Sequence, residues 1–109
     1  MAFVRVANVA EVAPGNIQEV LVEGKTVAVA NVEGEFFAID NACLHRGGPL
    51  GQGQLEGSIV TCPWHGWGFN VTTGKSSLSQ SVGVACYAIE VRGEEVFVDI
   101  RTPLVSYTK

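Results

Sequence analysis

Cys43-Leu44-His45-Arg46-Gly47 and Cys62-Pro63-Trp64-His65-Gly66 are the two stretches that decide how this 109-residue chain is interpreted. Each contains one cysteine and one histidine, and together they hold both histidines of the protein. Residues 46–61 separate the pairs, so the pattern is Cys-x-His followed by Cys-x-x-His. Glycines follow each pair and let backbone N–H groups approach a bound group without a side chain in the way. The pattern predicts four metal ligands, Cys43, His45, Cys62 and His65, divided equally between two loops.

Two metal chemistries use thiolates together with imidazoles. Structural zinc sites usually space paired cysteines by two to four residues and paired histidines by three to five. Here the two residue types alternate, and a single residue separates Cys43 from His45. In extended backbone such residues point the same way about 6 to 7 Å apart, which suits neighbouring metal atoms better than one atom. A bent loop could evade that argument, so a zinc-stabilised interaction module remains the alternative to an iron–sulfur cluster.

The segment from Cys43 through Phe69 resembles the Rieske cluster-binding motif, and the whole chain resembles a soluble Rieske-type ferredoxin. In a Rieske centre two histidines replace two cysteines on one iron of a 2Fe-2S cluster. The resemblance implies one such cluster per chain. It places Cys43 and Cys62 on the buried iron, and His45 and His65 on the outer iron near solvent. Neutral imidazoles make the cluster less negative than four thiolates would, which raises its reduction potential.

The residues outside the four predicted ligands help to decide whether this protein is an enzyme. Rieske oxygenases share this motif but need a second iron held by two histidines and a carboxylate, and both histidines here already belong to the motif. No phosphate-binding or dinucleotide fingerprint is present. The resemblance therefore implies an electron-transfer protein and not an enzyme. It implies a one-electron carrier between an NAD(P)H-dependent flavoprotein reductase and a terminal oxygenase.

A second interpretation keeps the same chemistry. The chain could be the small Rieske subunit of a multi-component reductase such as nitrite reductase, because such subunits share the cluster motif.

Length and charge restrict the remaining classes of protein. We expect one domain, 1–109, without a second catalytic domain. The net charge of −4 and the scatter of the 7 lysines and arginines argue against nucleic acid as a partner. No apolar run approaches the roughly 18 residues that span a bilayer. We therefore expect no membrane partner and a cytoplasmic location.

Cysteine use supports that compartment. Cys86 lies in the apolar run 84–89, so we predict a small buried core residue and not half of a disulfide. The Rieske proteins of cytochrome bc complexes, which this chain resembles, carry an additional cysteine in each ligand loop. Gly48 and Trp64 hold the matching positions here, so that bridge cannot form.

The rest of the chain is rich in β-branched and aromatic residues. Three pairs of short apolar segments flank Glu23-Gly24, Glu33-Gly34 and Arg92-Gly93, and each is predicted to be a hairpin with glycine at a position of positive φ. The paired segments are 20–22 with 27–29, 29–32 with 36–39, and 88–91 with 96–100. These patterns, with the resemblance, predict an all-β Rieske fold. We expect an antiparallel sandwich or barrel scaffold with a small inserted cluster-binding subdomain, about 43–69.

Two further features lie beside the motif. Trp64 and Trp67 are predicted to pack the ligand loops together and exclude water, because large aromatics beside a cluster more often pack than relay electrons. The segment 76–81 falls where many Rieske proteins carry a proline-bearing loop over the cluster. Here that segment contains no proline.

The reduction potential provides a test of this interpretation. High-potential Rieske proteins place a serine and a tyrosine after the second ligand pair, and their hydroxyls donate hydrogen bonds to cluster sulfurs. The corresponding residues here are Trp67 and Phe69. Because such bonds favour the more negative reduced cluster, we predict a potential toward the low end of the Rieske range of roughly −150 to +300 mV. It should be nearly independent of pH around neutrality.

Protein-film voltammetry measures this potential directly. A midpoint above about +100 mV would contradict the low-potential prediction. A steep fall in potential between mildly acidic and neutral pH would contradict it equally.

Overall fold

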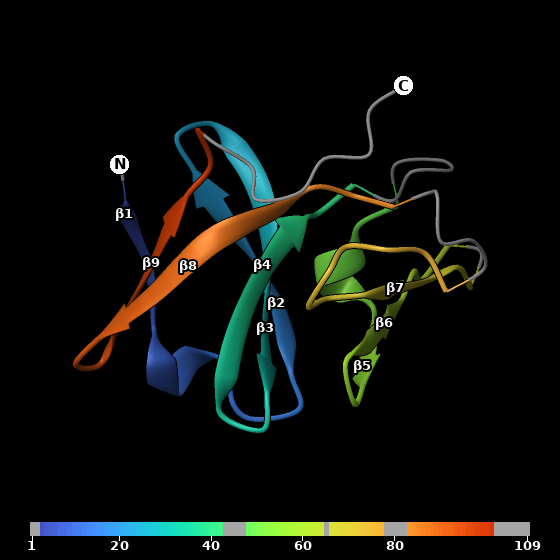
Figure 1. The fold of residues 1–109 in the computed structure, drawn as a ribbon, viewed down its shortest axis with the longest axis horizontal. Helices are drawn as coiled ribbons and strands as arrows, with labels where there is room; N and C mark the ends of the chain where they lie inside the picture. Colours follow the sequence, from blue (N-terminus) through green and yellow to red (C-terminus); the bar gives the residue numbers. More distant parts are fainter. Residues whose placement is uncertain (1–2, 43–47, 65, 78–82, 102–109) are drawn as a thin grey trace.

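The computed structural model describes residues 3–42, 48–64, 66–77 and 83–101 (Figure 1). Within these ranges the chain forms nine strands and two short 3₁₀ helices. The strands are β1 (Val4–Asn8), β2 (Ile17–Val22), β3 (Lys25–Val32), β4 (Glu35–Asp40), β5 (Gln54–Glu56), β6 (Ile59–Thr61), β7 (Gly68–Asn70), β8 (Cys86–Arg92) and β9 (Glu95–Asp99). The helices are η1 (Val9–Glu11) and η2 (Leu50–Gln52).

Two antiparallel sheets account for all nine strands. Six strands pair in the order β1-β9-β8-β4-β3-β2, and the other three pair in the order β5-β6-β7. The outer strands β1 and β2 of the large sheet contact each other, which nearly closes it into a barrel. Figure 1 shows the small sheet, in green to yellow, beside the β2–β4 part of the large one. The predicted all-β fold is confirmed.

The long strand β3 is buried on both faces. Val27 and Val29 point into the core of the large sheet, where they pack with residues such as Val98. The intervening Ala28 and Ala30 belong to a second core, which contains side chains of the small sheet. Because successive side chains of a strand point to opposite faces, this one strand contributes to both cores. The small alanines lie on the face that the small sheet covers.

The turns of the first two hairpins follow the prediction. In Glu23-Gly24 the φ angles are 51° and 86°, and in Glu33-Gly34 they are 53° and 98°. Positive φ at both central residues is the mark of type I′ turns, which match the twist of paired strands. The strands extend beyond the predicted segments, since pairing in the β2–β3 hairpin runs from Ile17–Ala30 to Val22–Lys25.

The turn of the third hairpin differs from the prediction by one residue. Arg92 pairs with Glu95, so the central residues are Gly93 and Glu94 and not Arg92-Gly93. Gly93 takes a φ of 62° at the first of these positions, where a type II′ turn requires glycine. Arg92 stays in the strand, with its guanidinium carbon 4.6 Å from the centre of the Phe97 ring.

Neither Cys62 nor Cys86 forms a disulfide. Cys86 is 5% exposed and belongs to the core beneath the small sheet, as predicted.

No helix in the described part of the chain has both the length and the apolar character needed to cross a membrane.

Asp40 joins three strands where the chain leaves the large sheet for the first ligand stretch. Its carboxylate accepts a hydrogen bond from the Tyr87 hydroxyl at 2.5 Å, and Lys25 Nζ lies 3.1 Å from the same oxygen. Burial raises the pKa of Tyr87, and the hydrogen bond to Asp40 and the charge of that carboxylate raise it further. The neutral phenol is therefore the form that the folded state prefers.

Replacing Tyr87 by phenylalanine tests this arrangement. A pKa raised by folding adds stability that is present below the unfolded value of about 10 and is lost as the pH rises above it. At pH 8 we expect Tyr87→Phe to lower the free energy of unfolding by about 1 kcal/mol, the usual net value of one hydrogen bond. Above about pH 10 the difference should shrink. Denaturant unfolding of both proteins along a pH series measures it, and a pH-independent difference would contradict the assignment.

Candidate metal centre

The structure describes one of the four predicted ligands. Cys62 lies in the described part of the chain, whereas Cys43, His45 and His65 lie outside it. Within the described ranges, no three histidine, cysteine or acidic side chains gather at one point. The geometry around Cys62, and around the ends of the two ligand stretches, therefore carries the structural argument.

The first ligand stretch is closed at its base. Ala42 and Pro49 form an isolated antiparallel bridge. Next to this bridge the Leu50 N–H donates a hydrogen bond to the Asn41 carbonyl at 2.6 Å. Backbone contacts thus hold the residues before and after 43–48 side by side.

The second ligand stretch is a tight turn. The Cys62 N–H donates to the Trp67 carbonyl at 2.7 Å, and the Gly66 N–H donates to the Cys62 carbonyl at 3.0 Å. Gly66 has a φ of 77°, in the region that favours glycine. The Cys62 side chain, 1% exposed, lies in the same core as Ala28 and Ile39. Core packing therefore determines where this sulfur lies.

The two stretches meet at Gly48. A Cβ atom on Gly48 would lie 2.6 Å from Cys62 Sγ and 3.1 Å from Trp64 Cγ. The backbone that ends the first stretch is therefore in direct contact with the sulfur ligand of the second, and only glycine allows that approach. A buried soft sulfur with bare backbone against it fits an iron–sulfur cluster, whose ligands are thiolates and whose sulfurs accept backbone hydrogen bonds.

The two tryptophans behave differently. Trp67 is partly buried and packs against the core that contains Cys62, which confirms the packing prediction for this residue. Trp64 is 62% exposed, so the prediction that it excludes water is wrong, although its ring does contact Gly48 at the end of the first ligand stretch. In contrast to Trp64, both Cys62 and Trp67 pack in or against the core.

The serine-rich segment enters along the small sheet. Ser76 pairs with Phe69, and the Ser77 N–H donates to the Gly68 carbonyl at 2.8 Å. Residues 78–82 lie outside the described ranges. Most of the predicted covering loop, 76–81, therefore lies outside the described residues.

Sequence reasoning missed a polar network at the base of the first stretch. Asn41 Nδ2 donates to Glu19 Oε2 at 2.7 Å, and the Gly51 N–H donates to Asn41 Oδ1, also at 2.7 Å. Gln52 Nε2 donates to Glu19 Oε1 at 3.1 Å. These partners lie far apart in the sequence and form no motif, so nothing in the sequence indicates them.

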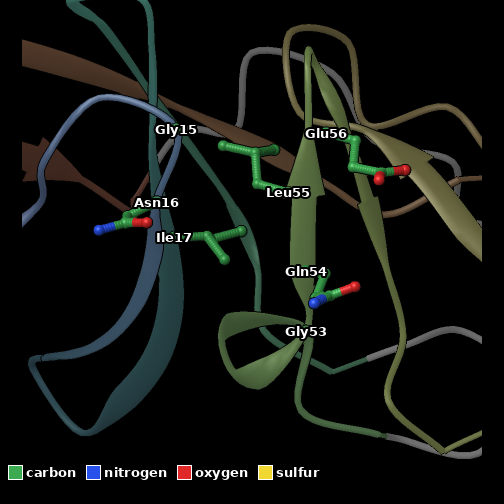
Figure 2. Close-up of a pocket in the computed structure, with 7 residues that line it drawn as sticks. All are labelled: Gly15, Asn16, Ile17, Gly53, Gln54, Leu55 and Glu56. Atoms are coloured by element: carbon green, nitrogen blue, oxygen red, sulfur yellow. The ribbon is translucent and has the colours of Figure 1, made fainter.

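A pocket of about 330 Å³ marks the seam between the two sheets. It lies between 15–17 on one side and 53–56 on the other. Figure 2 shows the Ile17 and Leu55 side chains pointing toward each other across this seam, while Asn16 and Glu56 point away. Both apolar side chains pack against the core that contains Cys62. The seam therefore helps to fix the small sheet against the large one.

Comparison with known proteins identifies the class. Residues 2–88 match the family model of the Rieske [2Fe-2S] domain, and the chain belongs to that family. The ferredoxin component of the naphthalene 1,2-dioxygenase system of Pseudomonas aeruginosa is 35% identical, over 83% of this chain and 88% of its own. The biphenyl dioxygenase ferredoxin subunit of Pseudomonas sp. (strain KKS102) is 38% identical, and the match covers 91% of this chain and 93% of that subunit.

A solved structure agrees with these relatives. A chain in the complex of reduced oxygenase and oxidized ferredoxin in carbazole 1,9a-dioxygenase superposes with a TM-score of 0.80 at 34% identity, over 88% of this chain and 91% of that one. Within its family this chain is an electron carrier of the ferredoxin type, with a Rieske 2Fe-2S cluster, and not an enzyme. The predicted cofactor and class are confirmed, and the zinc interpretation is wrong.

Substitution of Gly48 tests the contact between the two ligand stretches. In Gly48→Ala the new methyl group would lie 2.6 Å from Cys62 Sγ, so the loops must separate. We expect the affinity for the cluster to fall about 10-fold, as when other groups that support a metal ligand are changed. Iron and acid-labile sulfide per chain, with the visible spectrum, measure the loss.

Gly57→Ala is the matched control. Gly57 also lies in a turn, with a φ of 61° and nothing within 4 Å of a new Cβ. It should cost about 1 kcal/mol of stability through backbone strain and leave cluster content unchanged. Equal cluster content in both variants would contradict the role of Gly48.

Proposed function

We propose that Cys43, His45, Cys62 and His65 hold the cluster. We further propose that the chain passes single electrons from an NAD(P)H-dependent flavoprotein reductase to the terminal oxygenase of an aromatic-ring dioxygenase system. The contact between Gly48 and Cys62 Sγ carries the ligand assignment, because it brings both cysteine- and histidine-bearing stretches to one buried sulfur. The names of the relatives carry the partner assignment.

The described residues around Cys62 suit a resident redox group. When held by Cys43, His45, Cys62 and His65, the cluster would supply a centre that accepts one electron and gives it back. Cys62 is buried in an apolar core, and Phe69 is fully buried in the same core. These side chains bury the sulfur on the side of the core, so a redox partner would approach the cluster from the side that faces away from the core. That side is where Trp64 is exposed.

The docking partner follows from the relatives. The similar carbazole system contains a complex of reduced oxygenase and oxidized ferredoxin. A net charge of −4 on this chain suits a basic docking surface, because opposite charges increase the rate of encounter. A ferredoxin role is therefore preferred over that of a nitrite reductase subunit.

Domain organisation and location belong to the same proposal. We assign 1–109 to a single domain, with the cluster-binding subdomain at about 43–69. The pairing of β5, β6 and β7 only with one another, among the described strands, supports that subdomain. A cytoplasmic location suits thiolate ligands and the buried Cys86, because that compartment keeps thiols reduced.

Ligand substitutions test the assignment. His45→Ala or His65→Ala should abolish the Rieske electron paramagnetic resonance signal and visible spectrum, because the sequence contains no further histidine. Cys86→Ala should keep both signals and cost about 1 kcal/mol of stability through lost packing. A native Rieske signal in either histidine variant would refute the ligand set.

Electron transfer tests the role itself. The reductase and oxygenase of the Pseudomonas aeruginosa naphthalene 1,2-dioxygenase system can be combined with this chain in place of their own ferredoxin. Reduction of the chain by NADH with the reductase, followed by reoxidation on mixing with the oxygenase, is the expected result. A chain that takes up an electron from dithionite but exchanges none with either component would contradict the assignment to this class of partner.

A further inference from the structure

The polar network at the base of the first ligand stretch joins the large sheet to that stretch. We call the group of Glu19, Asn41, Gly51 and Gln52 the Glu19–Asn41 clamp. Glu19 lies on β2, and its two carboxylate oxygens accept one hydrogen bond each, from Asn41 and Gln52. The Asn41 side chain uses its other end to accept the Gly51 N–H. One carboxylate thus connects a strand of the scaffold to residues on both sides of 43–48.

The clamp leaves little room for movement. Asn41 is 8% exposed, so loss of a partner would leave a polar amide unpaired in a nearly water-free place, at a substantial cost. A Cβ on Gly51 would collide with Glu19 Cγ and lie 2.8 Å from Asn41 Oδ1.

The position of the clamp gives it a role beyond general stability. Asn41 lies two residues before the predicted ligand Cys43, and η2 begins two residues after Gly48. Gly48 in turn contacts Cys62 Sγ. The sheet order β4-β3-β2 places Glu19 two strands away from the strand that leads to Asn41. Its contacts are therefore additional to the strand pairing that already holds β2.

We infer that Glu19 and Asn41 are positioning residues for the cluster: the clamp sets the separation and orientation of the two ends of the first ligand stretch. This inference rests on the proposed ligand set. It assigns the function to the matched donor and acceptor pairing of the two side chains and not to the negative charge of Glu19.

An exchange of the two side-chain types separates these possibilities. In Asn41→Asp a second carboxylate faces Glu19 where an amide donated, so the pair repels and the clamp opens. In the double variant Glu19→Gln with Asn41→Asp, the new amide on β2 donates to the new carboxylate, which still accepts the Gly51 N–H. The exchange restores all three side-chain bonds, with donor and acceptor reversed between the two exchanged side chains. Glu19→Gln alone should retain the clamp, because the Gln52 amide can turn to accept.

The readouts are the rate of cluster loss to an iron chelator and the g-values of the reduced cluster. We expect Asn41→Asp to lose its cluster about 10-fold faster or more, the range found for groups that orient metal ligands, with shifted g-values. Glu19→Gln and the double variant should stay near the wild type in both. Gln18→Ala, an exposed neighbour on β2, is the control and should change neither.

Hydrogen exchange on the cluster-free chain gives an independent readout. Its expected result is faster exchange of the Gly51 amide in Asn41→Asp and recovery in the double variant. If the wild type takes up no Rieske cluster, the proposed function fails, and this exchange experiment still tests the clamp.

Two results would overturn the inference. One is a double variant that loses its cluster as fast as Asn41→Asp does. The other is an Asn41→Asp variant with a lower melting temperature but unchanged g-values and rate of cluster loss, which would make the clamp a purely structural contact.

Discussion

The arrangement of the site depends on the two alanines of β3. Ala28 and Ala30 have no side chain beyond Cβ, so the second layer of the molecule packs close to the large sheet. Phe69 and Cys62 both belong to the core that forms there. A larger residue at either alanine would push the small sheet outward, because close-packed cores do not absorb added volume cheaply. The place of a ligand sulfur is therefore decided by side chains of a strand that contains no ligand.

The ligand stretches themselves are organised mainly at their ends. Backbone hydrogen bonds close the turn between Cys62 and Trp67, and the Ala42–Pro49 bridge closes the base of the other stretch. Neither arrangement uses the side chain of a ligand. The protein can thus hold the frame of the site in place while thiolate and imidazole groups remain available for metal. Burial of Cys62 on one side and exposure of Trp64 on the other give this frame an inner and an outer face.

Local patterns predicted much of the fold. Glu23-Gly24 and Glu33-Gly34 carry their turn geometry in two adjacent residues, so the sequence alone was sufficient. The third turn was misplaced by one residue, because glycine can take either central position of a two-residue turn and the sequence does not say which. Burial of Cys86 followed from its apolar neighbours.

Contacts between distant residues were not predictable in the same way. The ligand spacing identified Cys62, but its contact with Gly48 depends on how two loops pack. The exposure of Trp64 depends on how the tight turn lies against the core. Glu19 and Asn41 are separated by a hairpin, and neither belongs to a periodic pattern. Such pairings are products of tertiary structure, so a single sequence contains no local sign of them.

The pairing between β4 and β8 in the large sheet is short, and the small sheet lies between these two strands in the chain. Strands β4 and β8 pair only through Ala38–Tyr87 and Ile39–Cys86, and residues 41–85 lie between them in the chain. Bringing together two strands so far apart in the sequence costs conformational entropy before their contacts can stabilise the pairing. The strands within β2–β3–β4 and within β8–β9 pair as consecutive hairpins, so we expect these units to form before β4 joins β8. The ligand-bearing segment therefore connects the two parts of the large sheet in the chain, so the place of both ligand stretches depends on the pairing of β4 with β8.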